Sequence, residues 1–66
     1  MLTLTLNGQP LERPQGETIR TLLAFRGLDP MKVAVELNRR LVRSSAYDTP
    51  LKDQDQIEIV TFVGGG

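Results

Sequence analysis

The first part of the chain alternates between apolar and polar residues. Residues 2–6 place leucines at every second position with threonines between them, which is the period of a half-buried strand. Asn7-Gly8 comes next, and this pair favours a type I′ hairpin because both central residues of that turn need a positive φ. The return strand is predicted at residues 9–13. We expect it at a sheet edge because Pro10 has no N–H to donate to a ladder.

The hydrophobic spacing then becomes helical. Thr18 can cap a helix with its hydroxyl, and the isoleucine and two leucines that follow it share one face, with a phenylalanine beside them. Gly27 fits the left-handed position that ends a helix, and Leu28 follows where it can pack back on Leu23. The sequence therefore predicts one helix over residues 18–26.

The second half of the chain predicts more strands joined by short connections. Alternating valines predict a third strand at residues 33–37, and after a tight turn at residues 38–40 a short fourth strand can form at residues 41–42. Residues 44–50 are irregular, with room for one helical turn capped by one of the two serines there. Residues 56–62 are rich in β-branched and aromatic residues and predict the last strand.

This order of elements is typical of an α+β fold in which one helix packs on one face of a mixed sheet of four or five strands. A right-handed crossover leaves two places for the third strand: beside the first strand, or separated from it by a gap that the last strand fills.

In the last strand, two isoleucines then face the helix, while Glu58, Val60 and Phe62 face water. Apolar residues on a solvent face are candidates for partner docking, although single surface hydrophobes are also common without such a role. We select Val60, Phe62 and the adjoining Val63 as docking candidates.

Composition removes several classes of function. The 66 residues include eight Lys and Arg and eight Asp and Glu, a formal net charge of zero, with no Cys, His or Trp. Disulfides, thiolate nucleophiles and histidine bases are therefore excluded. Zero net charge argues against charge-driven binding to nucleic acid or anionic membranes. We see no export signal and no apolar run near the roughly 20 residues of a membrane span, so we expect a cytoplasmic protein that is a monomer when free.

No internal catalytic or metal site is expected. The carboxylates are scattered over predicted turns and exposed strand positions, where solvated charges are the ordinary interpretation. The segment 53–55 resembles a fragment of a calcium loop but lacks the rest of that loop. A small basic cluster is a solvated face or helps to choose a protein partner; it consists of Arg39, Arg40 and Arg43.

The chain ends in Gly64, Gly65 and Gly66. Glycines lack side chains and have broad conformational freedom, so we divide the chain into a domain at residues 1–63 and a flexible tail at residues 64–66. Fully extended, the tail spans about 10 Å. Such a thread can enter another enzyme's narrow channel and present the Gly66 carboxylate for activation as an acyl-adenylate. The plain alternative is a frayed terminus.

The whole pattern resembles a known family more closely than the tail alone does. The matching segments are residues 4–8, the helix beginning at Thr18, residues 33–38, and residues 49–53 leading into residues 57–66. Together they are similar to the sulfur carriers of thiazole biosynthesis, the ThiS family, which have the ubiquitin-like β-grasp fold. The final segment carries the most specific part of this resemblance.

The resemblance implies that the chain is a protein cosubstrate and not an enzyme. A ubiquitin-activating-like adenylyltransferase would adenylate the Gly66 carboxylate with MgATP, and a cysteine-derived persulfide would convert it to a thiocarboxylate that supplies sulfur to thiazole synthase. Gly64 and Gly65 would pass through the partner's channel. No cofactor would be bound permanently. Alternatives are the carrier of molybdopterin synthase or of another thiolation pathway, a ubiquitin-like protein modifier, or a plain binding module.

Two turns depart from the family pattern. Arg39 and Gln54 stand where glycine is usual. A left-handed backbone at either residue costs about 1 kcal/mol relative to glycine. We expect Asn38 to absorb the first of these turns itself, because asparagine tolerates that region.

Overall fold

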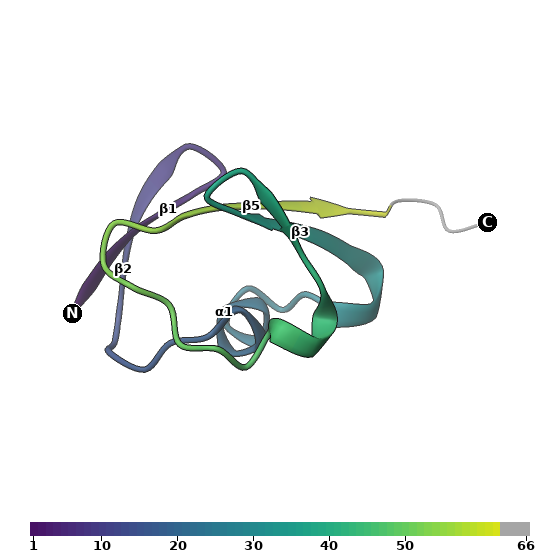
Figure 1. Cartoon of the computed structure of the whole chain (residues 1–66), viewed down its shortest axis with the longest axis horizontal. Helices are drawn as coiled ribbons and strands as arrows, with labels where there is room; N and C mark the ends of the chain where they lie inside the picture. Colours follow the sequence, from purple (N-terminus) through teal and green to yellow (C-terminus); the bar gives the residue numbers. More distant parts are fainter. Residues whose placement is uncertain (63–66) are drawn as a thin grey trace.

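The computed structural model describes residues 1–62 and has one helix packed on one face of a five-stranded mixed sheet (Figure 1). This confirms the predicted fold class. The strands and helix are β1 (Leu2–Leu6), β2 (Gln9–Arg13), α1 (Ile19–Phe25), β3 (Val33–Leu37), β4 (Arg40–Val42) and β5 (Gln56–Thr61). Two short 3₁₀ turns, at Pro30–Lys32 and Ser44–Ala46, precede β3 and follow β4.

The last strand lies in the centre of the sheet. The strand order is β2-β1-β5-β3-β4, with β5 parallel to β1 and antiparallel to β3. The sequence left two possible positions for the third strand. In the structure β3 is separated from β1, and β5 lies between them. Both hairpins lie at the outside, and β2 is an edge strand as Pro10 predicts.

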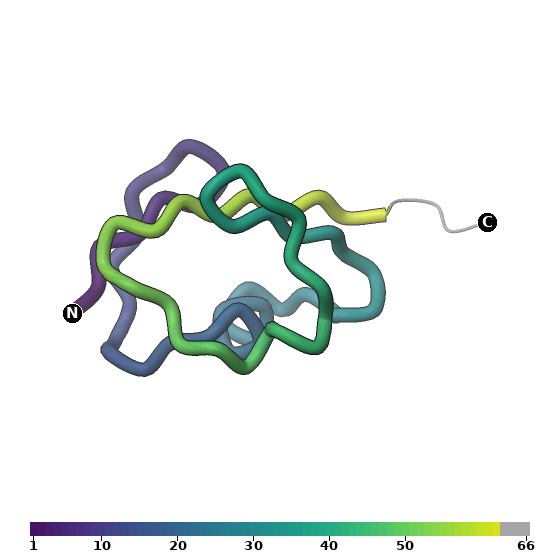
Figure 2. Tube along the Cα trace, in the orientation of Figure 1, coloured from purple at the N-terminus to yellow at the C-terminus, as the bar shows by residue number. Residues whose placement is uncertain are grey.

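The alternation in the strands decides which side chains reach the core. The leucines of β1 and the isoleucines of β5 are buried against the helix, as predicted. Two residues of the loop before β5, Tyr47 and Leu51, are also buried, at 3% and 5% exposure, and the sequence pattern does not predict their burial. Figure 2 follows this loop (green) from β4 past the helix to the start of β5. The loop thus contributes two side chains to the core between the helix and the sheet.

Both ends of α1 follow the local sequence. The Thr18 hydroxyl accepts a hydrogen bond from the Thr21 N–H (3.1 Å), and the Thr21 hydroxyl accepts one from the Thr18 N–H (2.9 Å), which forms a capping box. At the other end Gly27 has a φ of 70° and the Leu28 N–H donates to the Leu23 carbonyl (2.9 Å). This is the C-terminal arrangement that glycine favours, and the partly buried Leu28 packs against the core as predicted.

Both hairpins have positive φ at their two central residues: 49° and 81° at Asn7 and Gly8, and 51° and 70° at Asn38 and Arg39. The left-handed conformation predicted for Asn38 is confirmed. The expectation that Asn38 absorbs the turn alone is wrong, because a two-residue turn of type I′ needs positive φ at both positions. Gln54 also has a positive φ, 73°. Both glycine-replacing residues are therefore held in the left-handed region.

The turn after β4 forms without a serine cap. A 3₁₀ turn spans Ser44–Ala46, but it begins after Arg43 and has no side-chain cap. The backbone alone closes it, with the Ala46 N–H donating to the Arg43 carbonyl (2.8 Å). The predicted capping by Ser44 or Ser45 is therefore wrong, although the helical turn itself is present.

Replacing Gln54 by glycine should stabilise the protein. Gln54→Gly removes the left-handed strain and keeps the backbone bond from residue 54 to the Thr3 carbonyl (2.7 Å), so we expect a gain of about 1 kcal/mol in the free energy of unfolding. The matched control is Gln56→Gly in β5, which should lose roughly 0.5–1 kcal/mol because glycine weakens a strand. Urea unfolding measures both; an unchanged or lower midpoint for Gln54→Gly contradicts the strain argument.

Candidate functional site

The candidate site is the exposed face of β5 and the end of the described chain. Val60 and Phe62 are 61% and 60% exposed, so the predicted exposure of both side chains is confirmed. Their docking role stays a prediction. The Phe62 N–H donates to the Lys32 carbonyl (2.9 Å), so the last described residue is still bonded to the turn that precedes β3.

The remaining predicted site residues lie outside the described residues 1–62. They are the docking candidate Val63 and the tail residues Gly64, Gly65 and Gly66. The predicted boundary between a domain at residues 1–63 and a tail at residues 64–66 falls there as well. The described part of the site is therefore the strand that leads to this segment, together with the residues that hold it.

An asparagine side chain holds β5 on the β1 side. The backbone ladder between the two strands pairs Leu6 with Ile57, and the Asn7 N–H then donates to the Ile57 carbonyl (2.9 Å). Beyond this point the Asn7 side chain continues the pairing. Its Oδ1 accepts from the Ile59 N–H (2.8 Å) and its Nδ2 donates to the Ile59 carbonyl (3.3 Å). The amide thus occupies the place of one more strand residue.

The other hairpin turn holds the beginning of β5. The Asn38 N–H donates to the Gln56 carbonyl (2.7 Å), and its Oδ1 accepts from the Gln56 N–H (2.9 Å). Its Nδ2 donates to the Asp55 Oδ1 (3.0 Å), while the Asp55 Oδ2 accepts from the Lys52 N–H (2.8 Å). Two turn asparagines therefore hold β5, one from each side.

Two carboxylates are less exposed than the sequence suggests. Asp55 is only 9% exposed, and the two hydrogen bonds just described compensate its carboxylate for the lost contact with water. Glu17 is 4% exposed and pairs in a bidentate manner with the Arg13 guanidinium, at 3.0 and 3.1 Å. That guanidinium lies 3.7 Å from the centre of the half-exposed Phe25 ring. The expectation of solvated carboxylates is wrong for these two residues, since each has its own set of donors.

The neighbouring Asp53 does behave as a solvent-exposed turn charge. The Thr3 N–H donates to its Oδ1 (2.7 Å). This backbone hydrogen bond stabilises the charged form and lowers the pKa of Asp53 below its ordinary value. The bond attaches the loop before β5 to the first strand.

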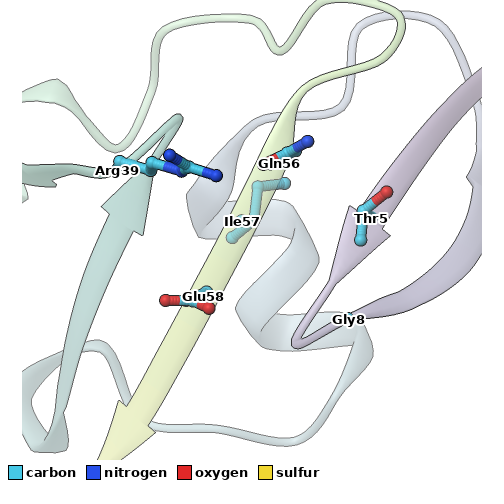
Figure 3. A pocket seen from close by; sticks show the side chains of 6 residues that line it. All are labelled: Thr5, Gly8, Arg39, Gln56, Ile57 and Glu58. Carbon is cyan, nitrogen blue, oxygen red and sulfur yellow. The ribbon is translucent and has the colours of Figure 1, made fainter.

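A shallow recess of about 410 Å³ lies over the beginning of β5 (Figure 3). Its lining residues are Thr5, Gly8, Arg39, Gln56, Ile57 and Glu58. Its charged residues, Arg39 and Glu58, form no ion pair within residues 1–62. The recess lacks a nucleophile with an adjacent base.

Residues 1–62 offer neither a cluster of metal ligands nor a helix that could span a membrane. Residues 1–62 contain no group of three or more acidic, histidine or cysteine side chains that could hold a metal ion. The helices formed by these residues fall short of the length and apolarity that a membrane span requires.

The sequence pattern predicts turns at both asparagines but does not predict their side-chain bonds to β5. Asparagine is favoured in left-handed turns for its backbone alone, so the turn pattern gives no reason to expect a second role. The length of the last strand could have indicated these bonds. That strand continues beyond the residues that β1 can pair, so its remaining backbone groups need another partner.

The sequence is similar to proteins of one known family. A family model described as the ThiS family matches residues 4–66. A protein of Bacillus subtilis (strain 168) named sulfur carrier protein ThiS is 42% identical over 65 residues, which cover 96% of this chain and 98% of that protein. The chain belongs to the ThiS family.

A solved structure agrees with this assignment. The crystal structure of thiamine biosynthesis protein ThiS from Geobacter metallireducens is 35% identical in sequence, with a TM-score of 0.77. The match covers 98% of the present chain and all of that one. The ubiquitin-like β-grasp fold expected from the resemblance is confirmed for this ThiS-family chain.

Two larger relatives carry a different name. Proteins of Magnetococcus marinus and Paramagnetospirillum magneticum, 42% and 39% identical over 66 residues, are named thiazole synthase. The ThiS-family chain spans 20% of the length of each. A segment of this family therefore occurs within proteins that bear the name of an enzyme.

The Asn7 side chain should protect the Ile59 amide. Asn7→Gly keeps the left-handed turn but removes the side chain, so we expect faster hydrogen exchange at Ile59 and a loss of about 1 kcal/mol in unfolding free energy. The matched variant Asn7→Asp tolerates the same backbone and can still accept from the Ile59 N–H. Equal exchange at Ile59 in both variants, measured by NMR, would show that the side-chain bond contributes nothing.

Proposed function

We propose that this chain is a sulfur carrier whose C-terminal Gly66 carboxyl group becomes a thiocarboxylate. The observation that carries the proposal is the family match, which extends to residue 66 and so includes the terminal glycines. Full-length similarity to proteins named sulfur carrier protein ThiS in Bacillus subtilis and Thermus thermophilus supports it.

The proposed chemistry begins with activation of the carboxylate. A ubiquitin-activating-like adenylyltransferase binds MgATP, and the Gly66 carboxylate attacks the α-phosphorus, forming the acyl-adenylate and releasing pyrophosphate. The terminal sulfur of a cysteine-derived persulfide then displaces AMP. A second thiol cleaves the resulting acyl persulfide at its S–S bond, which leaves the thiocarboxylate and a disulfide.

In this proposal the chain is a cosubstrate and its partners are the enzymes. The sequence has no cysteine to act as a thiolate and no histidine to act as a base, the groups most often used for such transfers. The carrier supplies a folded handle and a terminal carboxylate. The nucleotide site and the sulfur-donating thiol belong to the partners, and no cofactor is held permanently.

Thiazole synthase is the acceptor that the comparisons support. Two proteins with that name contain a segment similar to this chain, and joining a carrier to its acceptor raises their effective concentration. Val60 and Phe62, both exposed beside the end of the chain, are the proposed docking residues, together with Val63.

Intact mass tests the carrier function. The full chain is incubated with an adenylyltransferase of this family, MgATP and a persulfide donor, and replacement of one oxygen by sulfur should add about 16 Da. Deleting Gly66 should abolish the gain and leave the amide NMR spectrum of residues 1–62 in place. An unchanged mass of the full chain argues for a plain binding module, and a mass equal to a conjugate argues for a protein modifier.

The two phenylalanines of the chain provide a matched test of docking. Both are more than half exposed, Phe62 at the end of β5 and Phe25 at the end of α1. Phe62→Ala should raise the KM for the carrier in adenylation about tenfold and cost less than about 1 kcal/mol of stability. Phe25→Ala should leave that KM unchanged. Equal effects of the two variants, or a stability loss of about 3 kcal/mol for Phe62→Ala, would exclude the docking role.

A further inference from the structure

A second apolar surface lies beside edge strand β4, which is separated from β5 by β3. It is a groove of about 480 Å³ between β4, the 3₁₀ turn that follows it and the start of α1. Its apolar lining residues are Ile19, Leu37, Leu41, Val42, Ala46 and Pro50. Leu41 is 71% exposed, more than either Val60 or Phe62. Such a side chain beside a groove favours contact with another molecule.

The same strand has a free hydrogen-bonding edge. Leu37 and Arg40 flank the two-residue turn and therefore exchange both backbone hydrogen bonds, so the alternation of an antiparallel ladder turns the N–H and C=O of Leu41 away from β3. The opposite edge of the sheet differs. On β2 the corresponding outward position, paired with Thr5, is occupied by Pro10, which has no N–H to offer. Only β4 thus presents an outward donor and acceptor at this position of its hairpin.

The groove is accompanied by positive charge. Arg43 is its charged lining residue, and Arg40 lies at the start of the same strand with Arg39 just before it. The ion pairs formed within residues 1–62 use Arg13 and Arg20 instead. These three arginines are therefore available to carboxylates from outside the described fold.

The charge decides which occupant fits this edge. A second copy paired along β4 would place the same three arginines against each other, which is unfavourable. We propose that β4 binds an extended acidic segment of a partner protein. The segment adds a strand by exchanging backbone hydrogen bonds with Leu41, places apolar side chains in the groove, and sets its carboxylates beside Arg40 and Arg43. This site is separate from the proposed tail chemistry and does not depend on it.

A peptide titration tests the proposal on the full chain. The probe is acetyl-Glu-Glu-Val-Leu-Val-Glu-Glu-amide, and amide NMR shifts are followed in the isotope-labelled protein. Shifts should concentrate at residues 40–46 and at Thr49, which line or adjoin the groove. The same peptide with lysine in place of glutamate should bind about tenfold more weakly. Equal binding of the two peptides, or shifts confined to the outer face of β5, would overturn the proposal.

Two pairs of variants identify the contacts. Leu41→Pro removes the outward N–H without taking a ladder bond, and it should weaken binding about fivefold relative to Leu41→Ala, which keeps that donor. The double variant Arg40→Glu and Arg43→Glu should lose about tenfold, whereas Arg26→Glu at the end of α1 should lose nothing. Equal losses within either pair contradict the assigned contacts. Concentration-dependent dimers in sedimentation would instead assign the edge to a second copy.

Discussion

The described fold depends on keeping both sides of one strand paired. β5 lies at the centre of the sheet with β1 and β3 on its two sides, and an unpaired backbone group there would cost about 1–3 kcal/mol. The backbone of β1 reaches only part of the way along it. The Asn7 amide continues the pairing at Ile59, and the Asn38 amide completes it at Gln56. Beyond β5, the Phe62 N–H donates to the carbonyl of Lys32, the residue before β3, so the chain is still held there.

The same asparagines explain why the hairpins tolerate backbone strain. Each turn needs positive φ at both central residues, and asparagine supplies the first of them at low cost while its side chain bonds to β5. Arg39 then has to take the second left-handed position in its turn. The penalty at that residue is offset by the bonds that the turn makes to the central strand.

The two outer strands have opposite chemical characters. β2 carries Pro10 at the outward position nearest its turn and has no donor there, whereas β4 keeps the outward backbone groups of Leu41 beside an apolar groove and arginines. The arginines beside β4 oppose self-association along that edge and favour the acidic partner that we propose for it. A small protein with more than one such surface can be distinguished by more than one partner.

The sequence by itself determined the elements, because their signals are local. The alternation of apolar and polar residues predicts β1, β3 and β5. Thr18 and Gly27 predict where the helix begins and ends. The terminal glycines make Gly66 the candidate site residue. It also placed Val60 and Phe62 on the solvent side, since a strand with one buried face exposes every second residue.

Only the tertiary structure decided what depends on partners distant along the chain. The position of β5 between β1 and β3, the burial of Tyr47 and Asp55, and the bonds from Asn7 to a residue 52 positions away all arise from packing. A turn pattern specifies the backbone of an asparagine but not the target of its amide. That target depends on which strand lies at the centre of the sheet, and the strand order depends on the packing of all the core residues together.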